Sequence, residues 1–303
     1  MKKQHIAFLL IFLLLPLLLH ARVEGHFDRT LTVSGTVHLD LTTGSGDITV
    51  KAGNSNQVVI HGKISSNNEW FSNSEGAVRQ VESNPPIQQN GNDIRIGYNL
   101  PEEVRRHVSI SYEVMVPADA TVQAHSGSGG VNLEGIRGEV QGQTGSGDIR
   151  LRDLGGRVHV QTGSGGIRAQ DVAAPFFGHT GSGDIEAELT GSGSGDVDIQ
   201  SGSGGVRLRG IKGGLHARTG SGDISADGSV TGPWQLHTGS GTIRLAIGSG
   251  GFNLDVHTGS GSIHSDLPIT VQGSMGKREL KGTVRGGGPE VAVSTGSGDV
   301  DIR

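Results

Sequence analysis

The stretch Thr144-Gly145-Ser146-Gly147-Asp148-Ile149 decides the fold, because close variants of it recur along most of the chain. Counted from the first glycine, the copies begin at Gly44, Gly127, Gly145, Gly163, Gly181, Gly202, Gly220, Gly239, Gly259 and Gly296. From Gly127 to Gly181 the copies follow one another every 18 residues. Self-similarity at a fixed period predicts a solenoid, in which each repeat buries its apolar side against its neighbours.

One full repeat contains two short strands and two turns. The strands lie at 149–152 and 158–162, and apolar residues alternate with polar ones in both. Because successive side chains of a strand point to opposite faces, the apolar set should point inward. That set is Ile149, Leu151, Val158 and Val160, with Leu154 at the second corner. The predicted fold class is therefore all-β, a parallel β-solenoid with two-strand coils of about 18 to 21 residues.

Glycine accounts for 53 of the 303 residues, a share that in an aperiodic sequence is typical of disorder. Here the glycines stand at fixed offsets from apolar pairs such as Ile149 and Leu151. We interpret them as corners of a regular structure, which need either a positive φ or a close approach of two backbones.

The first 21 residues are set apart from the fold. Lys2 and Lys3 precede the apolar run 6–19, and Ala21 supplies a small residue at a cleavage site. This order is that of a secretory signal peptide, so we expect residues 1–21 to be removed. The mature chain is then exported to the periplasm, the cell surface or the medium. No later stretch is apolar and long enough to be a transmembrane segment.

The charge and the cysteine count exclude several classes of function. The chain has no cysteine, which rules out a lipidated N-terminal cysteine, disulfides and thiolate sites. The formal net charge is −5, and it becomes about −7 once Lys2 and Lys3 are removed. Such a balance gives no electrostatic reason to bind nucleic acid.

The mature chain divides into two parts. Residues 22–120 form an N-terminal β unit, interrupted at 65–91 by an insertion with a short helix around 75–82. Residues 121–303 form the solenoid, with a protruding loop at 273–289.

The C-terminal residues 299–303 begin a coil that no further residues complete. We therefore expect an open end there, and open strand edges can self-associate end to end. The loop at 273–289 carries Lys277, Arg278 and Lys281, which suit it to guard that edge as a partial cap.

An aspartate after the second glycine of several copies resembles a repeated calcium ligand. It occurs at Asp47, Asp148, Asp184, Asp196, Asp223 and Asp299. Other copies hold glycine, threonine or serine at that position, whereas calcium needs six or more consistently placed oxygens. We interpret the aspartates as turn residues, and we predict no metal and no cofactor.

Three outward columns are candidate surfaces. The polar one stands two residues before the first glycine of each copy: Gln143, Gln161, His179, Gln200, Arg218, His237 and His257. Its candidate binding residues are His179, Arg218, His237 and His257. If the repeats stack in chain order, His237 and His257 are neighbours and can share a metal ion or an anion. The alternative is a ladder of stacked hydrogen-bonding side chains.

The other two columns have simpler interpretations. One mixes charges and is interpreted as a solvated face: Arg150, Arg168, Glu186, Asp198, Arg207, Ser225 and Arg244. The other is the threonine or serine before each first glycine, such as Thr144. Regular hydroxyl arrays of this kind can bind ordered water or sugar, but the flanking glycines indicate a corner instead.

The sequence gives little basis for catalysis, because the Gly-Ser-Gly runs are turn phrases and no His-Glu-x-x-His or phosphate loop is present. The repeated phrase, with Asn84-Pro85-Pro86-Ile87, the strand 108–116 before Pro117, and the glycine-rich 282–288, resembles the bacterial putative-adhesin family of exported β-strand-repeat proteins. Relatives of that family include envelope-stress proteins of Lia-type signalling. The resemblance implies a β-solenoid at the cell envelope and supplies no catalytic residues.

We therefore expect a non-enzymatic, adhesin-like interaction scaffold at the cell envelope or surface. Its partner would be an envelope protein or a polysaccharide. The alternative from another class is a carbohydrate-binding or carbohydrate-active β-helix.

Overall fold

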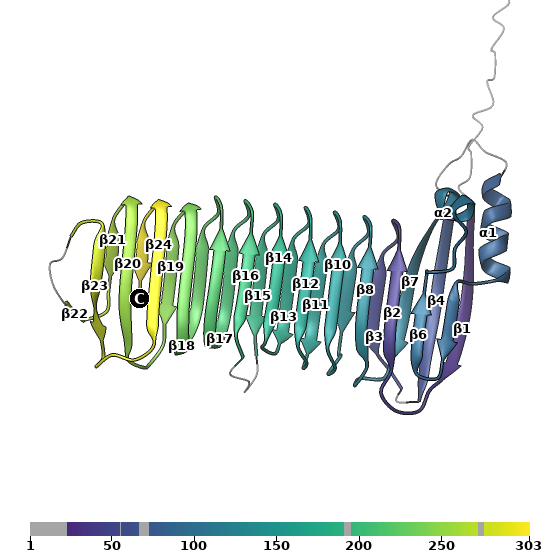
Figure 1. Cartoon of the computed structure of the whole chain (residues 1–303), viewed down its shortest axis with the longest axis horizontal. Coiled ribbons are helices and arrows are strands. Elements are labelled where there is room, and N and C mark those ends of the chain that lie inside the picture. Colours follow the sequence, from purple (N-terminus) through teal and green to yellow (C-terminus); the bar gives the residue numbers. More distant parts are fainter. Residues whose placement is uncertain (1–22, 55, 67–72, 191–194, 272–275) are drawn as a thin grey trace, which may run out of the picture.

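The computed structural model of the protein describes residues 23–303, except residues 55, 67–72, 191–194 and 272–275. The expected signal peptide at 1–21 lies outside the described residues. Within them the repeats stack side by side into an elongated body, with helices at one end only (Figure 1).

Two rows of parallel strands run along this body. The first row contains, in spatial order, β2 (His38–Thr43), β8 (Thr121–Ser126), β10 (Val140–Thr144), β12 (Val158–Thr162), β14 (Phe176–Thr180), β16 (Val197–Ser201), the later parts of β17 (Val206–Thr219) and β18 (Ile224–Ser240), β24 (Glu290–Ser297) and β20 (Phe252–Ser260). Each strand pairs with the equivalent strand of the next coil, as Val140 does with Val158.

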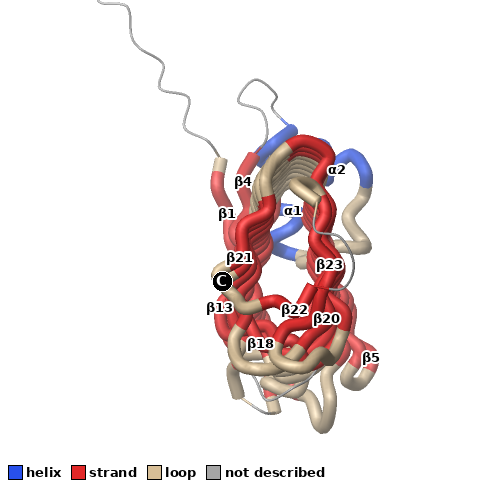
Figure 2. The backbone as a smooth tube through the Cα atoms, turned by 90° about the vertical axis from the view of Figure 1, so that its left-hand side faces the viewer, coloured by secondary structure: helices blue, strands red, loops and turns tan. Residues whose placement is uncertain are grey.

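The second row is built in the same way from the other half of each coil. It contains β3 (Ile48–Ala52), β9 (Val131–Glu134), β11 (Ile149–Leu154), β13 (Ile167–Val172), β15 (Ile185–Leu189), the early parts of β17 and β18, β19 (Ile243–Ile247), β25 (Val300–Ile302) and β21 (Ile263–Ser265). Seen along the body, the two rows form the long sides of a flattened ring (Figure 2).

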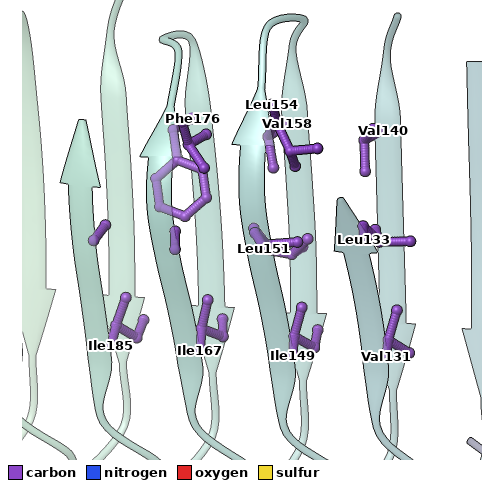
Figure 3. Packing of buried hydrophobic residues seen from close by; sticks show 14 of the residues in the cluster. Val131, Leu133, Val140, Ile149, Leu151, Leu154, Val158, Ile167, Phe176 and Ile185 are labelled. Atoms are coloured by element: carbon purple, nitrogen blue, oxygen red, sulfur yellow. The ribbon is translucent and has the colours of Figure 1, made fainter. Parts of the chain in front are cut away.

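The core is the thin layer between the rows. The inward residues predicted from the repeat are all buried: Ile149, Leu151, Leu154, Val158 and Val160. Figure 3 shows the same column in successive coils, where Ile149 and Ile167 lie side by side at paired positions of neighbouring strands. Phe176 has Gly178 as its inward neighbour on the same strand, where an added Cβ would lie 3.1 Å from Ile199 and 3.5 Å from the Phe176 ring, so the small residue leaves room for the large one.

The corner phrase is tight because successive coils touch through their backbones. A Cβ on Gly147 would lie 2.1 Å from the carbonyl oxygen of Gly129, and one on Gly145 would lie 2.3 Å from that of Gly127. Neither glycine has a positive φ. Of the two reasons that the sequence offered for these glycines, close backbone approach is the one that applies here.

The threonine before each first glycine ties neighbouring corners together. Thr180 Oγ1 donates to the carbonyl oxygen of Gly165 in the preceding coil at 2.8 Å, and it accepts the N–H of Gly183 at 3.1 Å. Equivalent bonds are made by Ser126, Thr144, Thr162, Ser201 and Thr219. These hydroxyls are buried, so this column is a structural seam and not a surface array.

An antiparallel cap closes the N-terminal end of the stack. The Gly44 coil contacts the Gly127 coil directly, since Gly127 N–H donates to Thr43 O at 3.0 Å. The chain between them forms the cap: β4 (Gln57–Ser66), α1 (Asn73–Ser83), β5 (Ile87–Asn90), β6 (Asp93–Ile96), α2 (Glu102–His107) and β7 (Val108–Val116), joined by β1 (Glu24–Thr32). Helix α1 includes the helix expected at 75–82, while α2 was not predicted.

The C-terminal end contains the main departure from the sequence-based prediction. Strands β24 and β25, from the last copy of the phrase, lie between the Gly239 and Gly259 coils. The expected open end at 299–303 is wrong, because β25 has a partner on each side. The outermost coil is instead the Gly259 one, and β23 (Glu279–Val284) pairs antiparallel with its strand β20 and with β22 (Ile269–Val271).

The all-β class is confirmed, and the predicted parallel pairing applies to the two rows of strands but not to the sheet as a whole. The sheet is mixed, because antiparallel pairings occur in the caps at both ends. Two antiparallel strands need only a short connection, so the chain next to an end coil can fold back and cover the open edge of that coil. A further parallel coil would not close the stack, because it would have an open edge of its own.

Candidate functional site

The outward column chosen from the sequence forms a continuous row across the first row of strands, which we call the polar ladder. Its members, in spatial order, are Thr42, His125, Gln143, Gln161, His179, Gln200, Arg218, His237, Ser294 and His257. Neighbours interact along it, with Gln143 Nε2 donating to Gln161 Oε1 at 3.3 Å and His237 Nδ1 lying 2.8 Å from Ser294 Oγ. The ladder thus presents amide, imidazole and hydroxyl groups at the strand spacing of about 4.8 Å.

Three shallow hollows lie along the polar ladder. His125, Gln161 and His179 line one of about 620 Å³, which reaches the glycine corners. A second, of about 200 Å³, lies beside His159 and Phe177, whose rings stack with centroids 6.0 Å apart. The third, of about 310 Å³, is lined by Arg218, His237 and His257 together. The structure therefore brings three of the four sequence-predicted residues into one hollow and places His179 farther along the same face.

His237 and His257 are not neighbours, contrary to the expectation from chain order. Ser294 of the inserted strand β24 pairs with both, so two strand spacings separate the histidines. That is about 9.6 Å between backbones, and Ser294, whose Oγ lies 2.8 Å from His237 Nδ1, stands between the two histidines. Across the described ranges, no group of three or more His, Asp, Glu or Cys side chains is placed to hold a metal ion.

The corner aspartates bind the backbone of the next coil. Oδ1 of Asp47 accepts the N–H of Gly130 at 2.7 Å, and Asp148 does the same for Gly166 at 3.0 Å. The same bond joins Asp184 to Gly205, Asp223 to Thr242 and Asp299 to Ser262. Asp196, which the sequence grouped with them, lies at the opposite corner, beside the strand that follows Pro175.

These bonds explain why aspartate alternates with other residues. The residues that follow the second glycine of each copy are, in the spatial order of the coils, Asp, Gly, Asp, Gly, Asp, Gly, Asp, Thr, Asp and Ser. Each aspartate accepts a hydrogen bond from the backbone of the following coil. A continuous column would place carboxylates on neighbouring strands, where like charges repel. The backbone N–H of Thr242 lowers the pKa of Asp223, and Ser262, through its hydroxyl and then its N–H, lowers that of Asp299.

The opposite, second row of strands carries a groove that the sequence analysis missed. Its volume is about 610 Å³, and it crosses β3, β9, β11, β13, β15 and the early part of β17. The sequence had assigned Asp198 to this face, but Asp198 lies in the first row, with Oδ1 3.1 Å from Nδ1 of His216. Without Asp198, the mixed-charge column of the sequence analysis contains more arginines than acidic residues. That excess of positive charge is the sequence signal that would have identified the groove.

No helix in the described part of the chain is long and apolar enough to cross a membrane. Among proteins of curated function, none matches this chain.

Three of the solved structures that match this chain are from Bacteroides and Parabacteroides species. A putative adhesin from Bacteroides fragilis is 11% identical, with a TM-score of 0.36 over 92% of this chain and 97% of that one.

The other two are similarly distant. A putative adhesin from Parabacteroides merdae is 12% identical, with a TM-score of 0.35 over 92% of this chain and 96% of that one. A putative lipid binding protein from Parabacteroides distasonis is 11% identical, with a TM-score of 0.28 over 92% of this chain and 96% of that one. All three scores are below 0.5, so the candidate sites rest on the geometry of this chain alone.

The family comparison is more extensive. Residues 36–303 match the family described as Toastrack DUF4097. The matched range contains every copy of the repeated phrase, from Gly44 to Gly296, together with both strand rows. The chain belongs to the Toastrack DUF4097 family.

Proposed function

We propose that the chain is a non-enzymatic, exported interaction scaffold of the cell envelope or surface, adhesin-like in its role. The polar ladder is its contact surface. One observation carries this proposal: Arg218, His237 and His257 line one open hollow on a face where polar side chains repeat at every strand.

A repeated surface of this kind suits an extended partner. Each rung offers one or two hydrogen-bonding groups, so a polymer lying along the stack meets the same chemistry at each step of about 4.8 Å. Individual contacts with exposed polar groups are weak, but contacts linked along one polymer add up. An envelope polysaccharide, rich in hydroxyl groups, or an extended segment of an envelope protein meets this requirement.

The shallowness of the hollows favours binding over catalysis. An active site needs groups that converge on the reacting atoms and a place from which water is excluded. The ladder residues instead point outward in parallel, and His179, Arg218, His237 and His257 are all exposed.

Co-sedimentation with isolated envelope material tests the proposal. The chain from residue 22 onward should sediment with cell-wall or outer-envelope preparations, and the triple variant Arg218→Ala, His237→Ala, His257→Ala should stay in the supernatant. A matched control replaces Ser225 and Arg244, which lie on the opposite row of nearby coils. Equal sedimentation of the parent and the triple variant would overturn the assignment to the ladder.

Two further measurements address the rest of the proposal. N-terminal sequencing of protein recovered from an expressing cell should begin after Ala21 if the chain is exported as proposed. Incubation with envelope polysaccharides should release no reducing ends. Release of reducing ends would replace the scaffold by the carbohydrate-active alternative.

A further inference from the structure

The groove on the second row, which we call the basic groove, is a channel between two rows of outward side chains. One row contains Thr49, Asn132, Arg150, Arg168, Glu186 and Arg207, and the other contains Lys51, Glu134, Arg152, Gln170, Glu188 and Arg209. Between them lie Leu133, Leu151, Ala169 and Ala187, whose side chains are buried in the core. Only their backbone can face the channel, so its floor is flat and free of side chains. It spans six neighbouring strands, about 24 Å.

The groove is cationic on a chain that is acidic overall. Six of its lining side chains are lysine or arginine and three are glutamate, whereas the whole chain carries a net charge of −5. A concave surface with an excess of one sign of charge focuses the electrostatic potential and raises the local concentration of the opposite charge. Arg150 and Arg168 even stand on neighbouring strands at paired positions, which by itself is unfavourable for the sheet.

The guanidinium groups keep most of their hydrogen-bonding capacity. Arg150 bonds Asp148 at 2.9 Å, but the closest ion-pair distance of Arg168 is 3.9 Å, to the same Asp148 oxygen. Arg207 lies 3.7 Å from Glu186, and Arg152 lies 3.9 Å from Glu134. These longer distances exceed hydrogen-bond length. A guanidinium has five N–H donors, so several donors along the groove are available to an anion.

We propose that the basic groove binds a linear acidic polysaccharide, lying along the stack with its carboxylate or phosphate groups on Arg168, Arg207 and Arg209. Guanidinium groups pair with such anions in a bidentate manner. The amides of Asn132 and Gln170 and the hydroxyl of Thr49, set among the charges, suit the hydroxyl groups of sugar rings.

The lining of the groove favours a glycan over a nucleic acid. Proteins that bind single-stranded nucleic acid combine positive charge with aromatic side chains on which bases stack. The groove-lining residues include no aromatic side chain. The basic groove and the polar ladder lie on opposite rows of strands. Loss of binding at one of these surfaces therefore leaves the other unaffected.

Affinity measurement with sodium polygalacturonate, a linear polymer of acidic sugars, tests the inference. The full mature chain should bind it at low salt and lose affinity steeply as salt rises, while uncharged dextran should not bind. The triple variant Arg168→Gln, Arg207→Gln, Arg209→Gln should bind at least tenfold more weakly. A charge-matched control, Arg29→Gln, Arg79→Gln, Arg105→Gln, alters exposed residues of the N-terminal cap and should bind like the parent.

Each outcome decides the proposal. Circular dichroism establishes that both variants are folded, as expected for outward substitutions. Equal loss in the groove variant and in the control would mean that only net charge matters, and it would overturn the site. Tighter binding of polyuridylate than of polygalacturonate would overturn the choice of glycan. Absence of binding to the acidic polymer by the parent would reject the groove as a site, whatever the ladder variants do with envelope material.

Discussion

Replacing Thr180 by valine should separate two neighbouring coils at their corner. The side chain is fully buried, and its hydroxyl donates to Gly165 O at 2.8 Å and accepts from Gly183 N at 3.1 Å. Valine keeps the volume but satisfies neither group. An unpaired buried polar group costs about 1–3 kcal/mol, so the two together should cost about 2–6 kcal/mol. Because each coil contacts only its neighbours, the loss should be local.

Hydrogen exchange at the corner amides is the suitable assay, since long repeat arrays do not unfold in two states. Exchange at Gly183 should accelerate strongly in Thr180→Val and much less in Thr180→Ser, which retains the hydroxyl and loses a methyl group worth about 1 kcal/mol. The equivalent corner at Thr219, two coils away, should be unchanged in both variants. If the valine variant exchanged as slowly as the serine variant, the hydroxyl seam would not be a source of stability.

The remaining predictions concern the core, the corners and the outer edge. Val158→Asp should destabilise by several kcal/mol, because it buries an unpaired charge, whereas His159→Asp on the outer face should cost under about 1 kcal/mol; thermal melts of the two compare them. Millimolar calcium should move the melting temperature by less than about a degree, and a large rise would contradict the corner role of the aspartates. Deleting 274–288 should uncover the edge of β20 and cause self-association detectable by light scattering, and a deletion variant that stayed monomeric would mean that this edge needs no cover. Asp223 and Asp299 have lowered pKa values, so their contribution is complete above the ordinary aspartate pKa of about 4 and is lost as the pH falls through the folded-state values. The melting temperature should therefore fall less steeply in acid for Asp223→Asn, Asp299→Asn than for the parent.

The repeat unit could be predicted from the sequence because the alternation of apolar and polar residues and the placing of glycines indicate the same structure in every copy. Alternation placed Val158 and Val160 inward, and the glycines marked the corners. The stacking order could not be predicted in the same way. All copies of the phrase look alike, so nothing local distinguishes a copy that follows the previous coil from one that inserts between two others.

One signal of the true order was nevertheless present. Aspartate and smaller residues alternate from Asp47 to Asp223, but in chain order Thr242 is followed by Ser262, which breaks the alternation. Placing Asp299 between them restores it, as the hydrogen bond from Ser262 N to Asp299 Oδ1 at 2.8 Å shows. The prediction that His237 and His257 adjoin failed for the same reason.

The candidate surfaces were predicted unevenly. The polar ladder follows from the position of each residue relative to its glycine, so its members could be named from the sequence alone. The basic groove could not, because it depends on which side chains of neighbouring coils leave a flat floor open between them. Assigning Asp198 to the wrong row also concealed the positive balance of that face.

The insertion of β24 and β25 sets the order in which the stack can form. Coils from Gly127 to Gly239 can each settle on the one made before, so their pairings are short in sequence and should form quickly. The Gly259 coil has no place to settle until residues 290–302 have arrived, since those residues form both of its parallel partners. Until then, the strands at 252–265 either lack their parallel partners or pair with the Gly239 coil, as β20 would with β18, and are displaced later. Completion of this end is thus expected to be the slow step of folding, and the period in which the chain is most exposed to aggregation.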